Sequence, residues 1–349
     1  MRSVRTRFVA GLLLGLALMA WFLGTLEWSA FLDALLEVHS GWVLLAALVL
    51  LGEFLIRALR WRVLLRPLSP RAALGPLLSA TIVGGAVNTL LPARAGDVAR
   101  PLVAQRRTGI PLGALVATNV VERVFDLVGM LSVLLLALAL LPEAGGPEGV
   151  LVANLRLYGL VLGGAGIAGL IVLFALARRR SLLLARLERL IGLLPRRLSA
   201  LAGRLLRSLL DGMTALERPG AIATALLLTL LLWFNGALSI FVLFQAFDLG
   251  LPFGAAAFTA VALALTVVLP QAPGFVGVFH VAIEKTMVLW GLGLAPAKVY
   301  AVLLWGVSFL PVTAIGLVAL WREGLSLGAL LLPDRGSLAP APGPCHDGS

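Results

Sequence analysis

Long apolar stretches separated by short polar segments dominate the chain. Runs of this length are typical of helices that cross a membrane, because about 20 apolar residues span a hydrocarbon core roughly 30 Å thick. One shorter apolar stretch, 42–56, ends in closely spaced arginines and predicts a second helix. The longer blocks, each predicted to be a span, are 8–26, 112–141, 157–176, 221–244 and 299–320.

Composition supports a membrane protein without a soluble catalytic domain. The 349 residues are 60% hydrophobic and 13% charged, whereas a soluble domain carries about 25% charged residues. The net charge of +11 does not indicate nucleic-acid binding, because most arginines lie in short loops between apolar blocks, as the positive-inside rule describes. Cys345 is the only cysteine, which excludes a disulfide framework and a thiolate metal cluster.

Loop charge determines the predicted topology. The basic segment 178–218 holds ten arginines, whereas 27–41 and 142–154 carry acids and neither arginine nor lysine. If every block crossed the membrane, 178–218 would lie outside, against the positive-inside rule. The conflict disappears if 72–110 enters the membrane from the cytoplasm and returns to the cytoplasm. The same count of crossings requires that 253–294 enters the membrane from outside and returns to the outside.

Both of these blocks contain helix breakers at their centres. The first reads Leu91-Pro92-Ala93-Arg94-Ala95-Gly96 and the second Leu269-Pro270-Gln271-Ala272-Pro273-Gly274. Proline and glycine end a helix, and broken segments in matching positions of inverted halves indicate a transporter's binding site. The alternative is two ordinary spans that end at a Leu-Pro stop. We therefore predict an all-α polytopic membrane protein of about eight hydrophobic segments: six full spans and two re-entrant broken segments in inverted halves.

The domain prediction is one membrane domain, 1–323, followed by a disordered tail, 324–349, rich in proline and glycine. Within the domain, 178–218 has leucines at helical spacing between arginines, which favours an amphipathic segment along the cytoplasmic headgroups. The basic N-terminus resembles a signal peptide, but its apolar stretch is longer than usual, so we expect a retained first helix.

A polar stripe is predicted on the helix that begins near residue 112. Asn119, Glu122, Arg123 and Asp126 share one helical face, and Glu122 lies about 15 Å into the membrane at 1.5 Å per residue. Ionisable groups at this depth are costly and mark functional sites by default. The alternative is a structural clamp between this helix and the first re-entrant block, in which the spare carboxylate pairs with Arg94 or Arg100.

A second polar set surrounds the first break: Asn88, Arg94, Asp97 and Arg100. Arginine binds phosphate through two parallel hydrogen bonds, and a helix that restarts after Gly96 would offer free N–H groups to an anion. The alternative for Asp97 is a helix N-cap.

Two further groups of charges have simpler interpretations. Past the second break, His280, Glu284 and Lys285 indicate an amphipathic helix on the outer face, without the HExxH pattern of a zinc site. At the end of the second helix, Arg57 and Arg60 fit arginines that reach the cytoplasmic interface, and Arg57 at i+4 is a sufficient partner for Glu53.

The motifs resemble the flippase-like membrane domain of lysylphosphatidylglycerol synthases and their stand-alone relatives. The family more often has glutamate at position 97. In its bifunctional members this domain is associated with flipping aminoacylated phosphatidylglycerol, and a separate soluble domain adds the amino acid. Other relatives are associated with polyprenyl-linked sugars. The resemblance rests on Arg60-Trp61, Gly84, Asn88, the stretch from Leu91 to Asp97, Arg100, the stretch from Val121 to Asp126, the stretch from Leu269 to Gly274, and Gly277.

The resemblance implies a flippase-like transporter that moves an anionic lipid or a lipid-linked molecule. The alternatives are a non-catalytic scaffold of a lipid or glycan pathway and an intramembrane enzyme acting on headgroups. Of these functions we expect transport, so the protein is not expected to be an enzyme. We expect no cofactor, metal or nucleic acid, with membrane lipids as partners, a multi-pass location in the cytoplasmic membrane, and both termini cytoplasmic. The sequence does not determine whether the protein forms a homo-oligomer. The predicted substrate-binding residues are Asn88, Arg94, Asp97, Arg100, Asn119, Glu122, Arg123, Asp126, Pro270 and Gly274.

Overall fold

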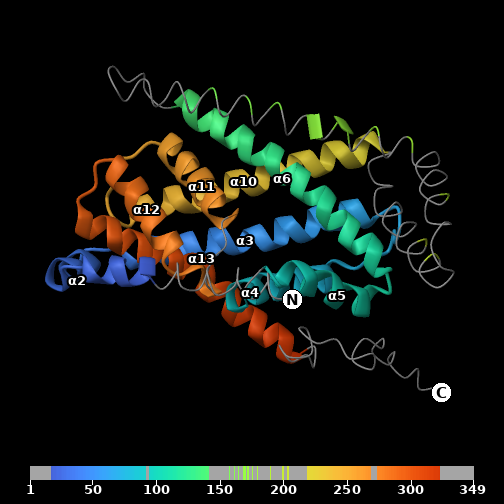
Figure 1. Cartoon of the computed structure of the whole chain (residues 1–349), viewed down its shortest axis with the longest axis horizontal. Coiled ribbons are helices and arrows are strands. Elements are labelled where there is room, and N and C mark those ends of the chain that lie inside the picture. The colour runs from blue at the N-terminus through green and yellow to red at the C-terminus, as the bar shows by residue number, and fades with distance from the viewer. Residues whose placement is uncertain are drawn as a thin grey trace.

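The chain folds into an assembly of helices. The computed structural model describes residues 17–91, 94–140, 218–268 and 273–322, together with isolated positions between 157 and 203. Within these residues the regular structure is helical and includes no strand. Figure 1 shows α3 and α10 lying side by side, with α6 crossing them at an angle. The predicted all-α polytopic class is confirmed.

Four helices of 26 to 29 residues form the frame. At 1.5 Å per residue each is roughly 40 Å long, and each is long and apolar enough to cross a membrane. The predicted spans 112–141, 221–244 and 299–320 are confirmed within a few residues. The predicted span 8–26 is described from residue 17 on and is helical over 17–24, whereas most of 157–176 lies outside the described residues. The four are α3 (Ser40–Leu65), α6 (Leu112–Leu140), α10 (Pro219–Gln245) and α13 (Leu294–Arg322).

The first broken block is a helical hairpin, as predicted for 72–110. Helix α4 (Leu74–Leu90) is followed by a turn and by α5 (Gly96–Thr108). The two backbones approach closely: a Cβ added at Gly96 would lie 1.9 Å from the carbonyl oxygen of Gly84. The hairpin opens toward the end of the molecule where α3 finishes and α6 begins.

The second broken block is also a hairpin, and it opens at the opposite end. Helix α11 (Phe253–Val268) follows the end of α10, and α12 (Val278–Leu289) precedes the start of α13. Between them, the short turn η2 (Pro273–Phe275) contains left-handed backbone at Gly274. The rings of Phe258 and Trp290 meet near the open end, 5.6 Å apart. The two predicted broken segments therefore form helical hairpins that open at opposite ends of the molecule.

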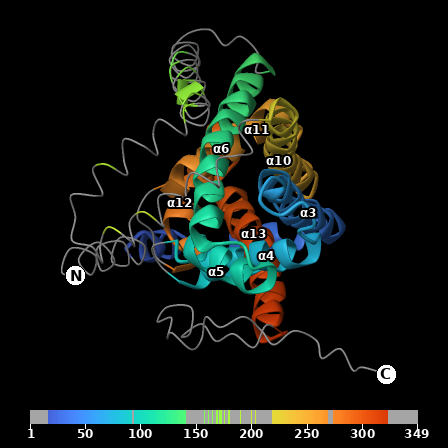
Figure 2. The ribbon, with the colours of Figure 1, turned by 90° about the vertical axis from the view of Figure 1, so that its right-hand side faces the viewer.

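The two ends of the molecule differ in charge among the described residues. The end where α3, α5 and α13 finish is the basic end, and it carries no carboxylate at its rim. The other is the acidic end, and its two lysines lie about a turn inside the helices. Figure 2, with the basic end facing the viewer, shows α3 and α10 nearly end-on beside the α4–α5 hairpin. The basic end has Arg62, Arg66, Arg71, Arg106, Arg107, Arg218 and Arg322; the acidic end has Glu27, Asp33, Glu37 and Asp248.

A short helix at the acidic end was not predicted from the sequence. Helix α2 (Trp28–Leu36) occupies part of the segment 27–41, for which the sequence indicates only an acidic connection. None of its residues is buried, and Trp28, Leu32 and Leu36 are exposed. Apolar exposure of this kind fits a helix that lies in the membrane interface.

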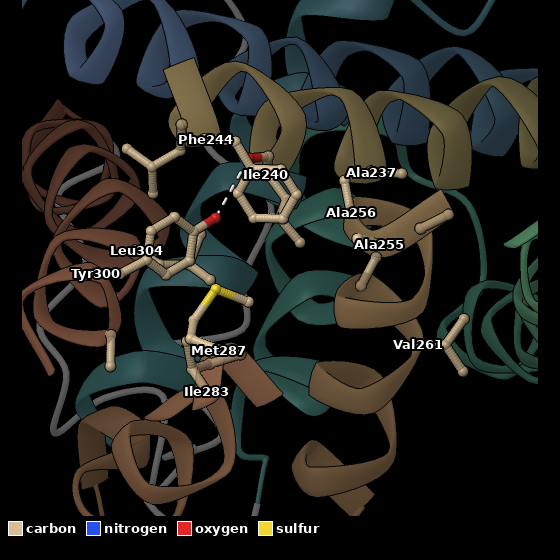
Figure 3. Packing of buried hydrophobic residues seen from close by; sticks show 14 of the residues in the cluster. Ala237, Ile240, Phe244, Ala255, Ala256, Val261, Ile283, Met287, Tyr300 and Leu304 are labelled. Atoms are coloured by element: carbon tan, nitrogen blue, oxygen red, sulfur yellow. Dashed lines mark hydrogen bonds between the residues drawn. The ribbon is translucent and has the colours of Figure 1, made fainter. Parts of the chain in front are cut away.

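The main apolar core joins α10, α11, α12 and α13. Figure 3 shows small side chains, Ala255 and Ala256 among them, letting α11 approach α10, while Met287 fills the space beside Tyr300. The buried hydroxyl of Tyr300 donates a hydrogen bond to the carbonyl of Ile240 at 3.2 Å. A second core packs the first hairpin against α3, α6 and α13. The two cores hold the hairpins in place, with their turns directed at each other.

Candidate functional site

The turns of the two hairpins meet at a cavity of about 220 Å³. Glu53, Asp126 and Ser308 lie at the midpoints of α3, α6 and α13, so the cavity and the ion pairs behind it lie near the middle of the frame. The cavity has a polar wall on the first hairpin and α3, and an aromatic wall on the second hairpin and α13. It is lined by Glu53, Phe54, Arg57, Thr81, Gly84, Gly85, Asn88, Thr89, Arg94, Gly96, Asp97, Arg100, Arg123, Phe275, Ser308, Phe309 and Val312.

Arg60 is the most buried charge behind the cavity, with 1% of its surface exposed. Its Nη1 donates to Asp126 Oδ1 at 2.6 Å and to Thr229 Oγ1 at 2.9 Å, and its Nε donates to Glu122 Oε1 at 3.3 Å. The interpretation of Arg60 as an arginine at the cytoplasmic interface is wrong. Helix α3 continues to Leu65, and the guanidinium ties α3 to α6 and α10. The helix continues because two carboxylates and a hydroxyl satisfy this charge inside the protein.

Arg100 joins the first hairpin to the same carboxylate. Its Nη1 donates to Glu122 Oε2 at 2.7 Å, and its guanidinium lies 3.9 Å from the centre of the Trp61 ring. Trp61 is fully buried and donates from Nε1 to Thr118 Oγ1 at 2.8 Å. The predicted pairing of a spare carboxylate with Arg100 is confirmed. No hydrogen bond or ion pair joins the guanidinium of Arg94 to a described residue, so the alternative pairing of a carboxylate with Arg94 fails.

Asp97 organises the rim of the cavity. Its Oδ1 accepts from Arg123 Nη2 at 2.7 Å and from Asn88 Nδ2 at 3.3 Å, and its carbonyl accepts from Asn119 Nδ2 at 3.3 Å. The N-cap interpretation of Asp97 is wrong, because Ala95 holds the cap position and the carboxylate bonds to side chains. The polar stripe on α6 therefore packs against the first hairpin, as the clamp hypothesis predicts.

The start of α5 does not offer free N–H groups to an anion. The N–H of Gly96 donates to Asn88 Oδ1 at 2.7 Å, and those of Asp97 and Val98 donate to the carbonyls of Arg94 and Ala95. The predicted anion site on this helix end is therefore already occupied by the protein itself. Binding of an anion has to come from side chains.

Arg94 is the exception among these arginines. It is exposed to the cavity, and its backbone has a φ of +56°. Among the described non-glycine residues only Arg94, Asp248 and Phe275 have positive φ, and two of these three line the cavity. Left-handed backbone at such residues is strained and clusters at functional sites. The packing around this turn therefore has to enforce the left-handed backbone of Arg94 at the cavity wall.

The charges of this region do not balance. On α3, Arg57 forms an ion pair with Glu53. On α6, Nη1 of Arg123 lies 3.8 Å from Oδ2 of Asp126. We call the nine charged residues the central network. It holds five guanidiniums against four carboxylates, and Arg94 is the member without a partner among the described residues. The network consists of Arg57, Arg60, Arg94, Arg100, Arg123, Glu53, Asp97, Glu122 and Asp126.

Most predicted site residues come together here. Those on the first hairpin and α6 all lie in the cavity wall or within the hydrogen-bonded contacts behind it, and Gly274 adjoins the cavity residue Phe275. Pro270 lies outside the described residues. The prediction missed Glu53, Arg57 and Arg60, although their spacing along one helix was the available signal. It also predicted an amphipathic surface for α12, which is wrong because His280 and Glu284 are buried.

Comparison with known proteins agrees with this architecture. The chain is 25% identical to the UPF0104 membrane protein MJ1078 of Methanocaldococcus jannaschii over 66% of this chain and 92% of that protein. It is 35% identical to the glycosyltransferase AglD of Haloferax volcanii over 39% of this chain, which corresponds to only 22% of AglD. No solved structure matches the chain.

The family comparison covers nearly the whole chain. Residues 8–316 match the family described as the lysylphosphatidylglycerol synthase TM region. This range includes both hairpins, the four long helices apart from the last residues of α13, and every residue of the central network. The resemblance seen in the motifs is confirmed: the chain belongs to the lysylphosphatidylglycerol synthase TM region family.

Proposed function

We propose that this protein is a flippase-like transporter that moves an anionic lipid, or a lipid-linked molecule with a phosphate, across the cytoplasmic membrane. The cavity between the two hairpin turns holds the phosphate while the tails stay in lipid. The protein acts without catalysis in this proposal, and the central network supports the walls of the cavity.

The surplus charge of Arg94 carries the proposal. A charge at membrane depth is costly, by at least about 2.5–3.5 kcal/mol on insertion scales, unless it is compensated. A phosphodiester has a single negative charge and accepts two parallel hydrogen bonds from a guanidinium. It would therefore neutralise the central network and satisfy Arg94 together. A cationic headgroup would instead add to the excess positive charge of the central network.

The arrangement of the hairpins supports transport. Broken segments that enter from opposite ends and meet near the middle are the structural pattern of transporter sites. Here the polar wall belongs largely to the first hairpin, and the aromatic wall belongs partly to the second, through Phe275 stacked on Phe309 at 5.0 Å. Movement of either hairpin alone would open the cavity toward one end of the molecule.

The charge difference between the ends supports an orientation. By the positive-inside rule, the basic end faces the cytoplasm and the acidic end faces outside. In this orientation the first hairpin opens to the cytoplasm, the second opens to the exterior, and both termini are cytoplasmic.

The relative named a glycosyltransferase favours a second cargo class. Its similarity to this chain covers 22% of its length, and this gives a reason to test lipid-linked glycans beside phospholipids. A polyprenyl phosphate offers the same phosphate chemistry to Arg94. A scaffold of such a pathway is the competing function, and it predicts that the protein works without Arg94 provided that it folds.

Lipid flipping in proteoliposomes tests the proposal. Fluorescent phospholipids, one anionic and one neutral, are exposed to a membrane-impermeant quencher, and the rate of loss of the protected signal is measured. We expect the wild-type protein to move the anionic lipid between leaflets faster than the neutral lipid. Because one charged hydrogen bond contributes about 1.5–3 kcal/mol, Arg94→Gln should reduce the rate roughly 10- to 100-fold.

The matched control is Arg71→Gln, which removes an exposed arginine at the basic end. It should flip lipid at the wild-type rate. Equal rates for wild type and Arg94→Gln would contradict the role of Arg94. Absence of flipping for the phospholipids and for a fluorescent polyprenyl phosphate would contradict the transporter proposal and favour the scaffold.

A further inference from the structure

A second polar group lies outside the central network, around α12. We call His280, Glu284, Lys285 and Lys298 the α12 cluster. Glu284 is fully buried, and Lys298 and His280 are 1% and 4% exposed. Glu284 lies five residues before the end of α12 at Leu289, about 8 Å along the helix from the acidic end. The cluster is thus buried but close to one surface.

Glu284 is a buried carboxylate without a hydrogen-bond donor among the described residues. Its closest cation is the ammonium of Lys285, 3.1 Å from Oε1 but outside hydrogen-bond geometry, on a side chain that is 59% exposed. Buried polar atoms are nearly always hydrogen-bonded, and each exception calls for an explanation. An ionised carboxylate in such a place is costly unless it is paired.

The other charges around Glu284 are already engaged or remote. Lys298 of α13 donates to Thr25 Oγ1 at 2.7 Å and to the carbonyls of Thr25 and Phe22. Glu27 lies beyond them, before α2, and helix α11 has no titratable residue in its sequence. Glu122 and Asp126, in contrast, receive short hydrogen bonds from arginines. Of the two buried glutamates in the described helices, Glu122 and Glu284, Glu284 is therefore the one without a hydrogen-bond donor.

His280 connects Glu284 to the cavity. It lies four residues earlier on the same face of α12, and its Nδ1 has no hydrogen-bond partner among the described residues. Its ring packs against Trp305, with centroids 5.8 Å apart, and Trp305 donates from Nε1 to the carbonyl of Gly274 at 2.7 Å. Gly274 is in the turn of the second hairpin, next to Phe275 in the cavity wall. Trp305 thus joins His280, one turn of α12 from Glu284, to the turn of the second hairpin.

We propose that Glu284, with His280 beside it, is a proton-binding site that couples proton entry from the acidic end to movement of the second hairpin. A proton from solution bonds to a carboxylate oxygen of Glu284, the ion pair with Lys285 is lost, and the lysine turns to the surface. Release of the same proton restores the pair. No other bond forms or breaks. Coupling to lipid movement rests on the proposed function, whereas the proton site does not.

Infrared difference spectroscopy of the purified full-length protein in lipid tests the proton site directly. The spectrum at pH 5 minus that at pH 8 is recorded for wild type, Glu284→Gln and Glu27→Gln. We expect a carbonyl band of a protonated carboxylic acid that Glu284→Gln lacks and Glu27→Gln retains. The same band in Glu284→Gln as in wild type, or no acid band in wild type, would overturn the proposal.

Lipid flipping under a pH gradient tests the coupling. Proteoliposomes with acid at the acidic end should flip faster than those at equal pH. Glu284→Gln, which removes the titrating carboxylate and its ion pair, should lose the stimulation by the gradient, whereas Glu27→Gln should retain it. A variant that responds to the gradient as wild type does would refute coupling through Glu284. An infrared band specific to Glu284 without any flipping would leave the proton site standing and would contradict only the transporter function.

Discussion

Arg60 is predicted to be the main stabilising contact of the central network. The perturbation is Arg60→Met, which keeps most of the side-chain volume and removes the charge. In wild type this guanidinium donates to two carboxylates and one hydroxyl on two other helices. After the substitution Glu122 keeps Arg100, whereas Asp126 keeps only Arg123 at 3.8 Å. A buried carboxylate is then left with poor compensation.

The size of the effect follows from this loss. Removing one partner of a buried ion pair costs about 3–5 kcal/mol, because the remaining charge stays buried. For domains of 150–250 residues, each kcal/mol lowers the Tm by roughly 2–4 °C. The Tm of Arg60→Met should therefore fall by about 6–20 °C. Asp126→Asn in the same background should recover part of the loss, because the orphaned charge is removed.

The assay is thermal unfolding of purified protein in detergent, followed by the fluorescence of its tryptophans. Arg71→Met is the matched control, since Arg71 is exposed and its replacement should change stability by no more than about 0.5 kcal/mol. An Arg60→Met variant that unfolds within 2 °C of the control would refute the inference that the network stabilises the fold. A double variant less stable than Arg60→Met would refute the explanation by an orphaned carboxylate.

Three further predictions concern the hairpins and the rim. Gly96→Ala should destabilise the protein or prevent its insertion, because the added Cβ would lie 1.9 Å from the carbonyl oxygen of Gly84. The control is Gly75→Ala, which should express normally because its Cβ meets no atom within 4 Å; Gly109 is unsuitable as a control because its φ is positive. Single cysteines at Arg71 and Arg107, with Cys345 replaced by serine, should react with an impermeant reagent from the same side of the membrane, and one at Leu289 from the other; opposite sides for 71 and 107 would show that α4 and α5 form a full span. Arg123→Gln should lower flipping of anionic lipid with little change in Tm, because this arginine is half exposed at the rim; a Tm loss as large as that of Arg60→Met would show that it is structural instead.

The frame and the hairpins could be predicted from the sequence because each follows from a local property. Apolar length indicates the spans, and the Leu-Pro breaks with loop charge indicate the re-entrant blocks. The end of α3 could not be predicted in this way. Arg57 and Arg60 look like interfacial residues until the partners of Arg60 are known, and Glu122, Asp126 and Thr229 are more than 60 residues away in the chain.

The candidate site, too, could be predicted from the sequence only in part. The stripe on α6 and the residues around the first break were found, since charge in an apolar helix stands out on its own. Their pairing was only partly predictable, because Arg94 and Arg100 are equivalent in the sequence and differ in backbone conformation and in contact with Trp61. The burial of Glu284 was not predicted because α12 has charges close to its end, and the packing of α11 and α13 against this helix cannot be seen in its own sequence.

The most direct measurement of the central claim is the position of an anionic headgroup in the protein. A phosphatidic acid analogue with a photoreactive group at the head is crosslinked to the protein in bilayers, and labelled residues are mapped by mass spectrometry. We predict labels on Asp97, Arg123, Phe275 or Phe309, reduced by excess unlabelled phosphatidic acid and lost in Arg94→Gln but not in Arg71→Gln. Labels confined to lipid-facing residues such as Val120 and Leu227, with an unlabelled cavity in wild type, would contradict the claim that this cavity holds the phosphate.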